Sequence, residues 1–321
     1  MPASRLGDAS ERVQNWKPRN TTADRRKVER VFDSVSRARH FTCVLDRSTA
    51  AVPAALRGAC ERRGIEYREV EAPNFDFDPA ERLPAGDLLY RPATSLAAMR
   101  VEQFLFAPGV ATFYAGSDDR IFFVGTSQPL AFERAGIRVP KTVYCASRDY
   151  DLLDRFAQRV RGLPLLAKMG GQAGAGVVIL ESHRALYSFV DYALSIGRPP
   201  MLTAFLANTR PWRVVVVGNR CVAAAELVCI HGDFRAIAHG GSGSFTTEPP
   251  SAIAAAAVAA VKATRLEFGG VDILDTADGP YVLESNFPCF FPEAELLAGI
   301  DVSGAMVDHL IRKAIALEST T

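Results

Sequence analysis

The sequence contains no long hydrophobic run and almost no net charge. None of its apolar stretches reaches the roughly 18 residues that a membrane-spanning helix needs, and the first 20 residues include no apolar core of signal-peptide length. With 37 basic and 36 acidic residues the formal net charge is +1, so the basic face typical of nucleic-acid-binding proteins is not expected. We therefore expect a cytoplasmic protein that binds neither a membrane nor nucleic acid.

Cysteine and histidine are scarce as well. The six cysteines form no CxxC pair and have no regular spacing, which favours reduced, mostly buried thiols. Cys289 lies three residues after Asn286. It either lines a site formed near Asn286 or is a small hydrophobic residue of the core. Five histidines leave few candidates for a Ser-His-Asp or Cys-His system, although His239 could act as a base or as a hydrogen-bonding loop residue.

Length and composition favour several modules. The chain has 321 residues, 48% of them apolar, which suits two or three modules with cores of their own. Residues 1–40 are polar and rich in arginine, and are expected to be a solvated extension or a substrate-covering segment with a short amphipathic helix. Residues 41–125 predict a small α/β module with a parallel sheet, its strands at FTCVLD, IEYREVEA, DLLYRPA and VATFYAG.

Two further modules are expected over residues 126–206 and 207–321. The segment SQPLAFERAGIRVP predicts a helix that ends at Gly136. Later strands are expected at TVYC, PLLAKM, GVVILE, MLTAFL and WRVVVVG, with helical stretches around residues 149–161 and 183–196. An alanine-rich helix is expected from Ser251 to Phe268, and a closing helix from Val302 to Ala316.

The most informative segment is GGVDILDTADGPYVLESN, near the end of the chain. Its two β-prone runs flank Asp278-Gly279, which predicts an antiparallel hairpin. On such a hairpin Asp272, Glu284 and Asn286 can project from one face. Magnesium takes one or two protein carboxylates and completes its shell with water and phosphate, so these residues suit a metal carried by a nucleotide. The alternative is a plain hairpin with polar edges, since turns and strand ends are rich in these residue types.

A glycine-rich loop follows the strand that ends at Lys168. Glycines let the backbone approach an anion closely, and a lysine just before them can reach the same phosphates. The loop lies between two predicted strands, unlike a P-loop or a dinucleotide fingerprint, each of which opens a helix. A strand-loop-strand cover over a triphosphate is therefore the interpretation, with an ordinary hairpin loop as the alternative. The glycines of this loop are Gly170, Gly171, Gly174 and Gly176.

Four segments in this order together resemble the ATP-grasp superfamily: AKMGGQAGAGVVIL, RPWRVVVVGNRCVAAAE, HGDFRAIAHGGSGS and GGVDILDTADGPYVLESN. The resemblance covers about residues 41 to 316 and is strongest to ribosomal-protein glutamate ligases and microviridin-type peptide ligases. It implies an α/β (α+β ATP-grasp) fold. A small N-terminal domain, residues 41–125, would precede a central lobe, residues 126–206, and a C-terminal lobe, residues 207–321, that clasp ATP between them.

The resemblance also implies roles for individual residues. Lys168 and the loop glycines would hold the phosphates of ATP. The hairpin residues Asp272, Glu284 and Asn286 would hold one or two Mg²⁺ ions, with Mn²⁺ as the alternative ion. Arg213 and Arg235 would meet the γ-phosphate or the acyl phosphate. The loop of residues 239–242 would lie near the substrate.

The sequence departs from the family pattern at three places. A further phosphate-binding lysine is expected near Gly125, where only Arg120 is close enough to substitute. The hinge between the lobes offers Ala204 where a ribose-binding carboxylate is common. Pro211 stands where an acidic partner of Arg213 is usual, so this arginine is expected to be oriented differently.

The implied reaction is ATP-dependent activation of a carboxylate as an acyl phosphate, followed by attack of an amine, with release of ADP and phosphate. The substrates would be small-molecule or peptide carboxylates and amines, and a homodimer is among the assemblies left open. Three alternatives remain: an inactive nucleotide-binding regulator, a ligase that forms an ester or closes a ring, and a carboxylate kinase. Positioning and charge neutralisation dominate phosphoryl transfer, and the cations named above suit that task.

Overall fold

The computed structural model describes residues 39–46, 51–116, 127–169, 176–228 and 244–319. All of the described helices and strands lie within residues 40–321, which form one compact unit. The extension expected at residues 1–40 lies almost entirely outside the described residues. None of the described helices has the length and apolarity needed to cross a membrane.

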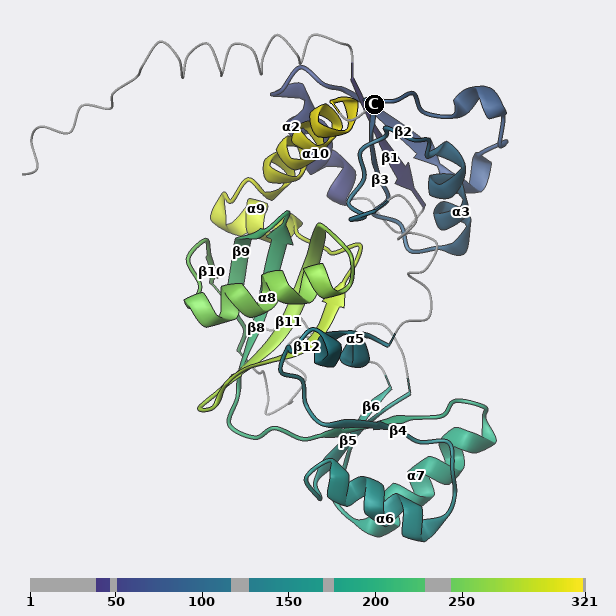
Figure 1. The fold of residues 1–321 in the computed structure, drawn as a ribbon, viewed down its shortest axis with the longest axis vertical. Helices are drawn as coiled ribbons and strands as arrows, with labels where there is room; N and C mark the ends of the chain where they lie inside the picture. The colour runs from purple at the N-terminus through teal and green to yellow at the C-terminus, as the bar shows by residue number, and fades with distance from the viewer. Residues whose placement is uncertain (1–38, 47–50, 117–126, 170–175, 229–243, 320–321) are drawn as a thin grey trace, which may run out of the picture. The chain divides into compact units, whose positions relative to one another are not determined.

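The first sheet is parallel, with the order β2-β1-β3 (Figure 1). Its central strand β1, His40–Leu45, is buried over almost its whole length, as expected of a parallel strand covered on both faces. This confirms the predicted parallel sheet. The other elements of this region are α2, Ala51–Glu61; β2, Glu66–Glu71; the 3₁₀ turns η1, Ala72–Asn74, and η2, Pro79–Glu81; β3, Leu88–Tyr90; and α3, Leu96–Leu105.

The prediction of a fourth strand at VATFYAG is wrong. This segment forms only single bridges, from Ala111 to Leu88 and from Tyr114 to Leu266. Its aromatic side chains are instead buried, with Phe113 and Tyr114 at most 4% exposed. Burial of β-prone aromatic residues therefore does not require a ladder of strand pairs.

The second sheet is antiparallel with the order β4-β7-β5-β6. Helices α6 and α7 bury their apolar side chains against one of its faces, where Leu165, Ala167 and Leu202 lie. By the alternation of a strand, Leu166 and Lys168 point to the other face. The bounds are β4, Thr142–Tyr144; α6, Tyr150–Arg159; β5, Leu165–Lys168; β6, Val177–Leu180; α7, His183–Ser195; and β7, Met201–Ala204.

The third sheet has the order β10-β9-β8-β11-β12 and is antiparallel throughout. Helix α8 lies across one face of it (Figure 1), and Val214, Val271 and Ile273 are buried on that side together with α8. The bounds are β8, Arg210–Val217; β9, Arg220–Glu226; β10, Phe245–Thr246; α8, Ser251–Ala263; β11, Phe268–Thr276; and β12, Gly279–Asn286.

One feature of this region differs from expectation, and a second had no predicted structure. The alanine-rich helix ends at Ala263, because Arg265 adopts a positive φ of 59° that no α-helix continues through, and Phe268 begins β11. Strand β9 contains three consecutive alanines, Ala223 to Ala225, which are strong helix formers. Pairing with β8 overrides that preference, and small side chains suit a surface packed closely against α8.

Two helices connect the modules. Helix α5, Gln128–Arg134, buries Phe132 in the core of the third sheet. Helix α10, Val302–Glu318, packs on α2 of the first module, and there Nε of Arg63 donates to Asp308 at 2.6 Å. A short helix α9, Pro292–Ala298, precedes α10.

A buried ion pair lies in the first module. Arg91 and Glu102 are 2% and 3% exposed, and Nε of Arg91 lies 2.8 Å from Oε2 of Glu102. The hydroxyl of Tyr114 donates to the same oxygen at 2.9 Å. The carboxylate therefore has both charge compensation and a hydrogen bond in a site without water access.

We predict that Glu102→Ala lowers the free energy of unfolding by about 3–5 kcal/mol, because it leaves the Arg91 charge buried without a partner. Urea unfolding followed by circular dichroism measures this. The control is Asp191→Ala, which breaks an exposed pair with Arg148 and should cost less than about 1 kcal/mol. Equal effects of the two variants would contradict the assigned importance of the buried pair.

Candidate active site

The β11–β12 hairpin closes with a two-residue loop. Thr276 pairs with Gly279, so the loop residues are Ala277 and Asp278, one position earlier than the predicted Asp278-Gly279 turn. Gly279 has a φ of +104°, a conformation that favours glycine over residues with a side chain. The hairpin prediction is thus confirmed and the position of its turn corrected.

A β-bulge in β12 sets the register of the site. From the turn up to the Ile273–Val282 pair, the two strands pair residue for residue, and then the register shifts so that Asp272 lies opposite Glu284. Leu283 is the extra residue. Without it Asp272 would oppose Leu283, and Glu284 would point to the other face of the sheet.

Three neighbouring strands contribute to one row of side chains. Asp272 on β11 pairs with Glu284 on β12 and, on its other side, with Arg213 on β8. Residues directly opposite one another in a sheet project from the same face. Nδ2 of Asn286 lies 3.0 Å from Oε1 of Glu284 and 3.4 Å from Oδ2 of Asp272. The three predicted ligand residues are therefore brought together.

The pKa values of Asp272 and Glu284 shift in opposite directions. Asp272 is 1% exposed, and its burial, reinforced by the charge of Glu284, raises its pKa well above the usual value despite Arg213. Glu284 is exposed at the surface. Desolvation opposes its ionisation, but hydrogen bonds from Asp272 and Asn286 and the charges of Lys168 and Arg213 prevail and lower its pKa.

Arg213 occupies space that is available because residue 270 is a glycine. Its Nη1 is 2.9 Å from Oδ1 of Asp272, although among the described residues that oxygen accepts no well-directed hydrogen bond. A Cβ added at Gly270 would come within 3.3 Å of Nη1 of Arg213 and within 2.9 Å of Cβ of Cys289. Burial raises the pKa of the Cys289 thiol to about 12, so this residue is an un-ionised thiol packed beneath the arginine.

The Lys168 ammonium interacts electrostatically with Glu284 and Asp272. Burial lowers the pKa of its ammonium, while the charges of Glu284 and Asp272 raise it. The residue ends β5, where Lys168 pairs with Val177 of β6. One step further, the Met169 amide donates to the Gly176 carbonyl at 3.1 Å. The loop after Lys168 therefore connects two antiparallel strands, which confirms the predicted strand-loop-strand arrangement.

Several predicted residues lie outside the described part of the chain. They are Gly170, Gly171, Gly174, Arg235, Gly125, Arg120 and residues 239–242. Of the loop glycines, Gly176 is described and has a φ of +81°. The roles assigned to the remaining residues stay predictions.

Two of the noted departures are visible in the structure. Ala204 is 2% exposed and packs with the α6 and α7 side of its sheet, so its side chain points away from the face that carries Lys168. Pro211 pairs with Leu274 within the third sheet. The carboxylate partner of Arg213 is Asp272 on the neighbouring strand, in place of an acidic residue on its own strand.

Sequence reasoning missed two contributors to the site. The Leu283 bulge carries no local signal, because a bulge is visible only once both strands are paired. Gln128, at the start of α5, forms two hydrogen bonds to the backbone of Ser285, between Glu284 and Asn286. The 157 positions that separate the two residues hide this contact from any motif search.

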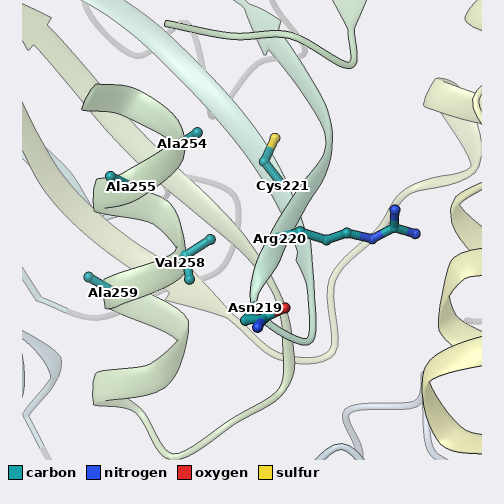
Figure 2. A pocket seen from close by; sticks show the side chains of 7 residues that line it. All are labelled: Asn219, Arg220, Cys221, Ala254, Ala255, Val258 and Ala259. Atoms are coloured by element: carbon teal, nitrogen blue, oxygen red, sulfur yellow. The ribbon is translucent and has the colours of Figure 1, made fainter. Parts of the chain in front are cut away.

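A hollow on the opposite side of the sheet is unrelated to this row of residues. Figure 2 shows it between the β8–β9 turn and α8, with the Arg220 side chain extending away from the helix. It has a volume of about 480 Å³ and a mostly apolar lining of Asn219, Arg220, Cys221, Ala254, Ala255, Val258 and Ala259. With no carboxylate and one arginine, it does not suit a metal nucleotide.

The chain is similar to known ligases. A probable alpha-L-glutamate ligase of Rhodopirellula baltica is 28% identical over 273 residues, which are 78% of this chain and 66% of that protein. The ribosomal protein bS6–L-glutamate ligase of Salmonella paratyphi B is 35% identical over 185 residues, which are 56% of this chain and 61% of the relative. The chain thus spans about two thirds or less of the length of these curated relatives.

A solved structure supports the fold. The ATP-grasp ligase PsnB, complexed with a phosphomimetic variant of a minimal precursor, Mg and ADP, matches with a TM-score of 0.64 at 19% identity, covering 86% of this chain and 98% of that one. The expected ATP-grasp fold is therefore confirmed. The model of the RimK-like ATP-grasp domain matches residues 127–310, more than half of the sequence, and the chain belongs to that family.

Proposed function

We propose that the protein is an ATP-dependent carboxylate–amine ligase that forms an amide or peptide bond and releases ADP and phosphate. One observation carries this proposal. Asp272, Glu284 and Asn286 converge on one face of the third sheet, where Arg213 contacts Asp272 and the charge of Lys168 reaches both carboxylates. Anionic ligands for a cation and cations for phosphate thus lie side by side.

The residues present fit a magnesium ion that arrives with a nucleotide. Among the described residues no group of three or more His, Cys, Asp or Glu could hold a metal by itself, which agrees with an ion that draws further ligands from phosphates and water. The buried Oδ1 of Asp272 has no well-directed donor among the described residues. Rotation of the Asn286 carboxamide would turn its oxygen toward the carboxylates in place of its nitrogen.

Asp272, Glu284 and Asn286 would hold one or two such ions. When bound, Mg²⁺ would offset the negative charge of the β- and γ-phosphates during transfer. Lys168 would contact the phosphates directly, since it ends β5 directly before the glycine-rich loop. Gly176 and the preceding loop glycines would bring backbone N–H groups to the same anion.

Arg213 is suited to the group that is transferred. Its side chain is 30% exposed, so it pairs with Asp272 while keeping donors available at the surface. In the proposed reaction a substrate carboxylate oxygen attacks the γ-phosphorus and ADP leaves; an amine then attacks the acyl carbon, loses a proton and expels phosphate. Arg213, together with Arg235 outside the described residues, would stabilise the charge that develops on the phosphoryl and acyl oxygens.

A protein or peptide is the proposed substrate class. The Salmonella relative is named for action on ribosomal protein bS6, and PsnB was solved with a minimal precursor. A long acceptor also suits Glu284 and Phe290, which are exposed at the surface on either side of Asn286, because a polypeptide can approach such a site with only one group entering it.

We predict that Glu284→Gln abolishes the Mg²⁺-dependent part of ATP binding. The loss should exceed the roughly 10- to 100-fold that removal of an outer-shell partner typically costs, because a neutral amide replaces a carboxylate ligand. Calorimetric titration with a non-hydrolysable ATP analogue, with Mg²⁺ or with a chelator, measures the difference. Glu181→Gln, an exposed carboxylate at the end of β6, is the matched control. Unchanged Mg²⁺ dependence in Glu284→Gln would refute the site.

We predict that Lys168→Met weakens ATP binding about 10- to 100-fold, both with Mg²⁺ and with a chelator. A charge-assisted hydrogen bond contributes about 1.5–3 kcal/mol, and methionine keeps the length of the side chain without its charge. The same titration measures this effect. Lys262→Met, on the exposed side of α8, should bind as the unmodified protein does. Equal affinities of the two variants would remove Lys168 from the phosphate site.

A further inference from the structure

Strand β12 is the outer strand of its sheet, so half of its backbone groups have no neighbouring strand. The side chain of Gln128 pairs with this edge at Ser285. Its Nε2 donates to the Ser285 carbonyl at 2.8 Å, and the Ser285 amide donates to its Oε1 at 2.9 Å. The carboxamide therefore makes the same two bonds that a paired strand residue would make.

Gln128 is itself held firmly. It is the first residue of α5, it is half-buried, and Pro129 follows it at a position that favours the start of a helix. One turn further along, Phe132 is 0% exposed in the core beneath the third sheet. The carboxamide is thus fixed by the same core that fixes β12.

The edge strand β12 is weakly paired next to the bulge at Leu283. The bulge at Leu283 interrupts pairing with β11 just before Glu284, and a bulge locally disrupts the ladder and bends its strand. On the outer side, the Val282 amide donates to the Arg138 carbonyl at 2.9 Å. Val282 and Ser285 therefore anchor the strand on both sides of the bulge and of Glu284.

We infer that Gln128 is a positioning residue for the metal–nucleotide site, an inference that rests on the proposed function. Its two bonds fix the backbone of Ser285, and this backbone sets the directions in which Glu284 and Asn286 leave the strand. Both side chains must converge with Asp272 to share one cation, so a small rotation of the peptide groups around Ser285 would separate them.

The chemistry of the contact is specific to glutamine. It requires one donor and one acceptor in a single plane, which only a carboxamide supplies. Asparagine has both groups but is one methylene shorter, glutamate at neutral pH lacks the donor, and methionine fills the volume without either bond. Gln128→Met therefore removes the two hydrogen bonds and keeps the packing.

The test compares Mn²⁺ binding in the presence of ADP, measured by electron paramagnetic resonance, in the full chain and in Gln128→Met. We expect Mn²⁺ affinity to fall about 10- to 100-fold, the usual effect of losing an outer-shell partner. ADP affinity in a chelator should stay unchanged. Amide hydrogen exchange without metal should show loss of protection at Ser285, since its N–H no longer has an acceptor.

Two matched variants separate positioning from general stability. Ala131→Gly weakens helix α5 while keeping Gln128, and Gln158→Met makes the same side-chain change at an exposed position of α6. Both should bind Mn²⁺ with ADP as the unmodified protein does. If Ala131→Gly weakens Mn²⁺ binding as much as Gln128→Met, the role is one of stability alone and the inference is overturned.

Two further outcomes distinguish this inference from the function on which it rests. Normal Mn²⁺ affinity in Gln128→Met, with the unmodified protein binding well, would overturn the positioning role and leave the proposed function intact. Failure of the folded, unmodified protein to bind Mn²⁺ with ADP would overturn both.

Discussion

Burial of the Asp272 carboxyl group in the middle of a sheet is the constraint on which the site depends. An ionised carboxylate removed from water is costly unless charges and hydrogen bonds compensate it. Arg213 and Asn286 supply part of that compensation, yet burial still raises the pKa of Asp272 above its usual value. In the proposed function a divalent cation would complete the balance, so the carboxylate that is costly to bury alone would be stabilised by a bound metal nucleotide.

The strand order of the third sheet places charged residues on both sides of Asp272. Because β11 lies between β8 and β12, a single row of directly opposed residues collects an arginine and two carboxyl groups from three strands. Gly270, two residues before Asp272 and on the same face, leaves space for Arg213 and Cys289. The absent side chain at Gly270 matters as much as the charged groups, since a Cβ there would lie 3.3 Å from Nη1 of Arg213 and 2.9 Å from Cβ of Cys289.

Much of this arrangement could be predicted from the sequence, because it rests on local patterns. Alternation and the Asp278-Gly279 pair indicated a hairpin, and the spacing of Glu284 and Asn286 placed both on one face. The bulge at Leu283 could not be predicted, since it reflects the balance between two paired strands rather than the preference of one residue. Strand β9 was not predicted, for a related reason. Pairing with β8 overrides the helix preference of its alanines.

The packing of α10 on α2 ties the end of the chain to its first module. Asp308 pairs with Arg63 across 245 positions of sequence, and α10 buries Met306, Leu310 and Ala314. Synthesis on the ribosome proceeds from the N-terminus, and domains usually fold in that order. Here α2 precedes in sequence the helix that packs on it, with the second and third sheets between them. The packing of α2 on α10 therefore forms only after the strands of the second and third sheets, which lie between them in sequence, have been synthesised.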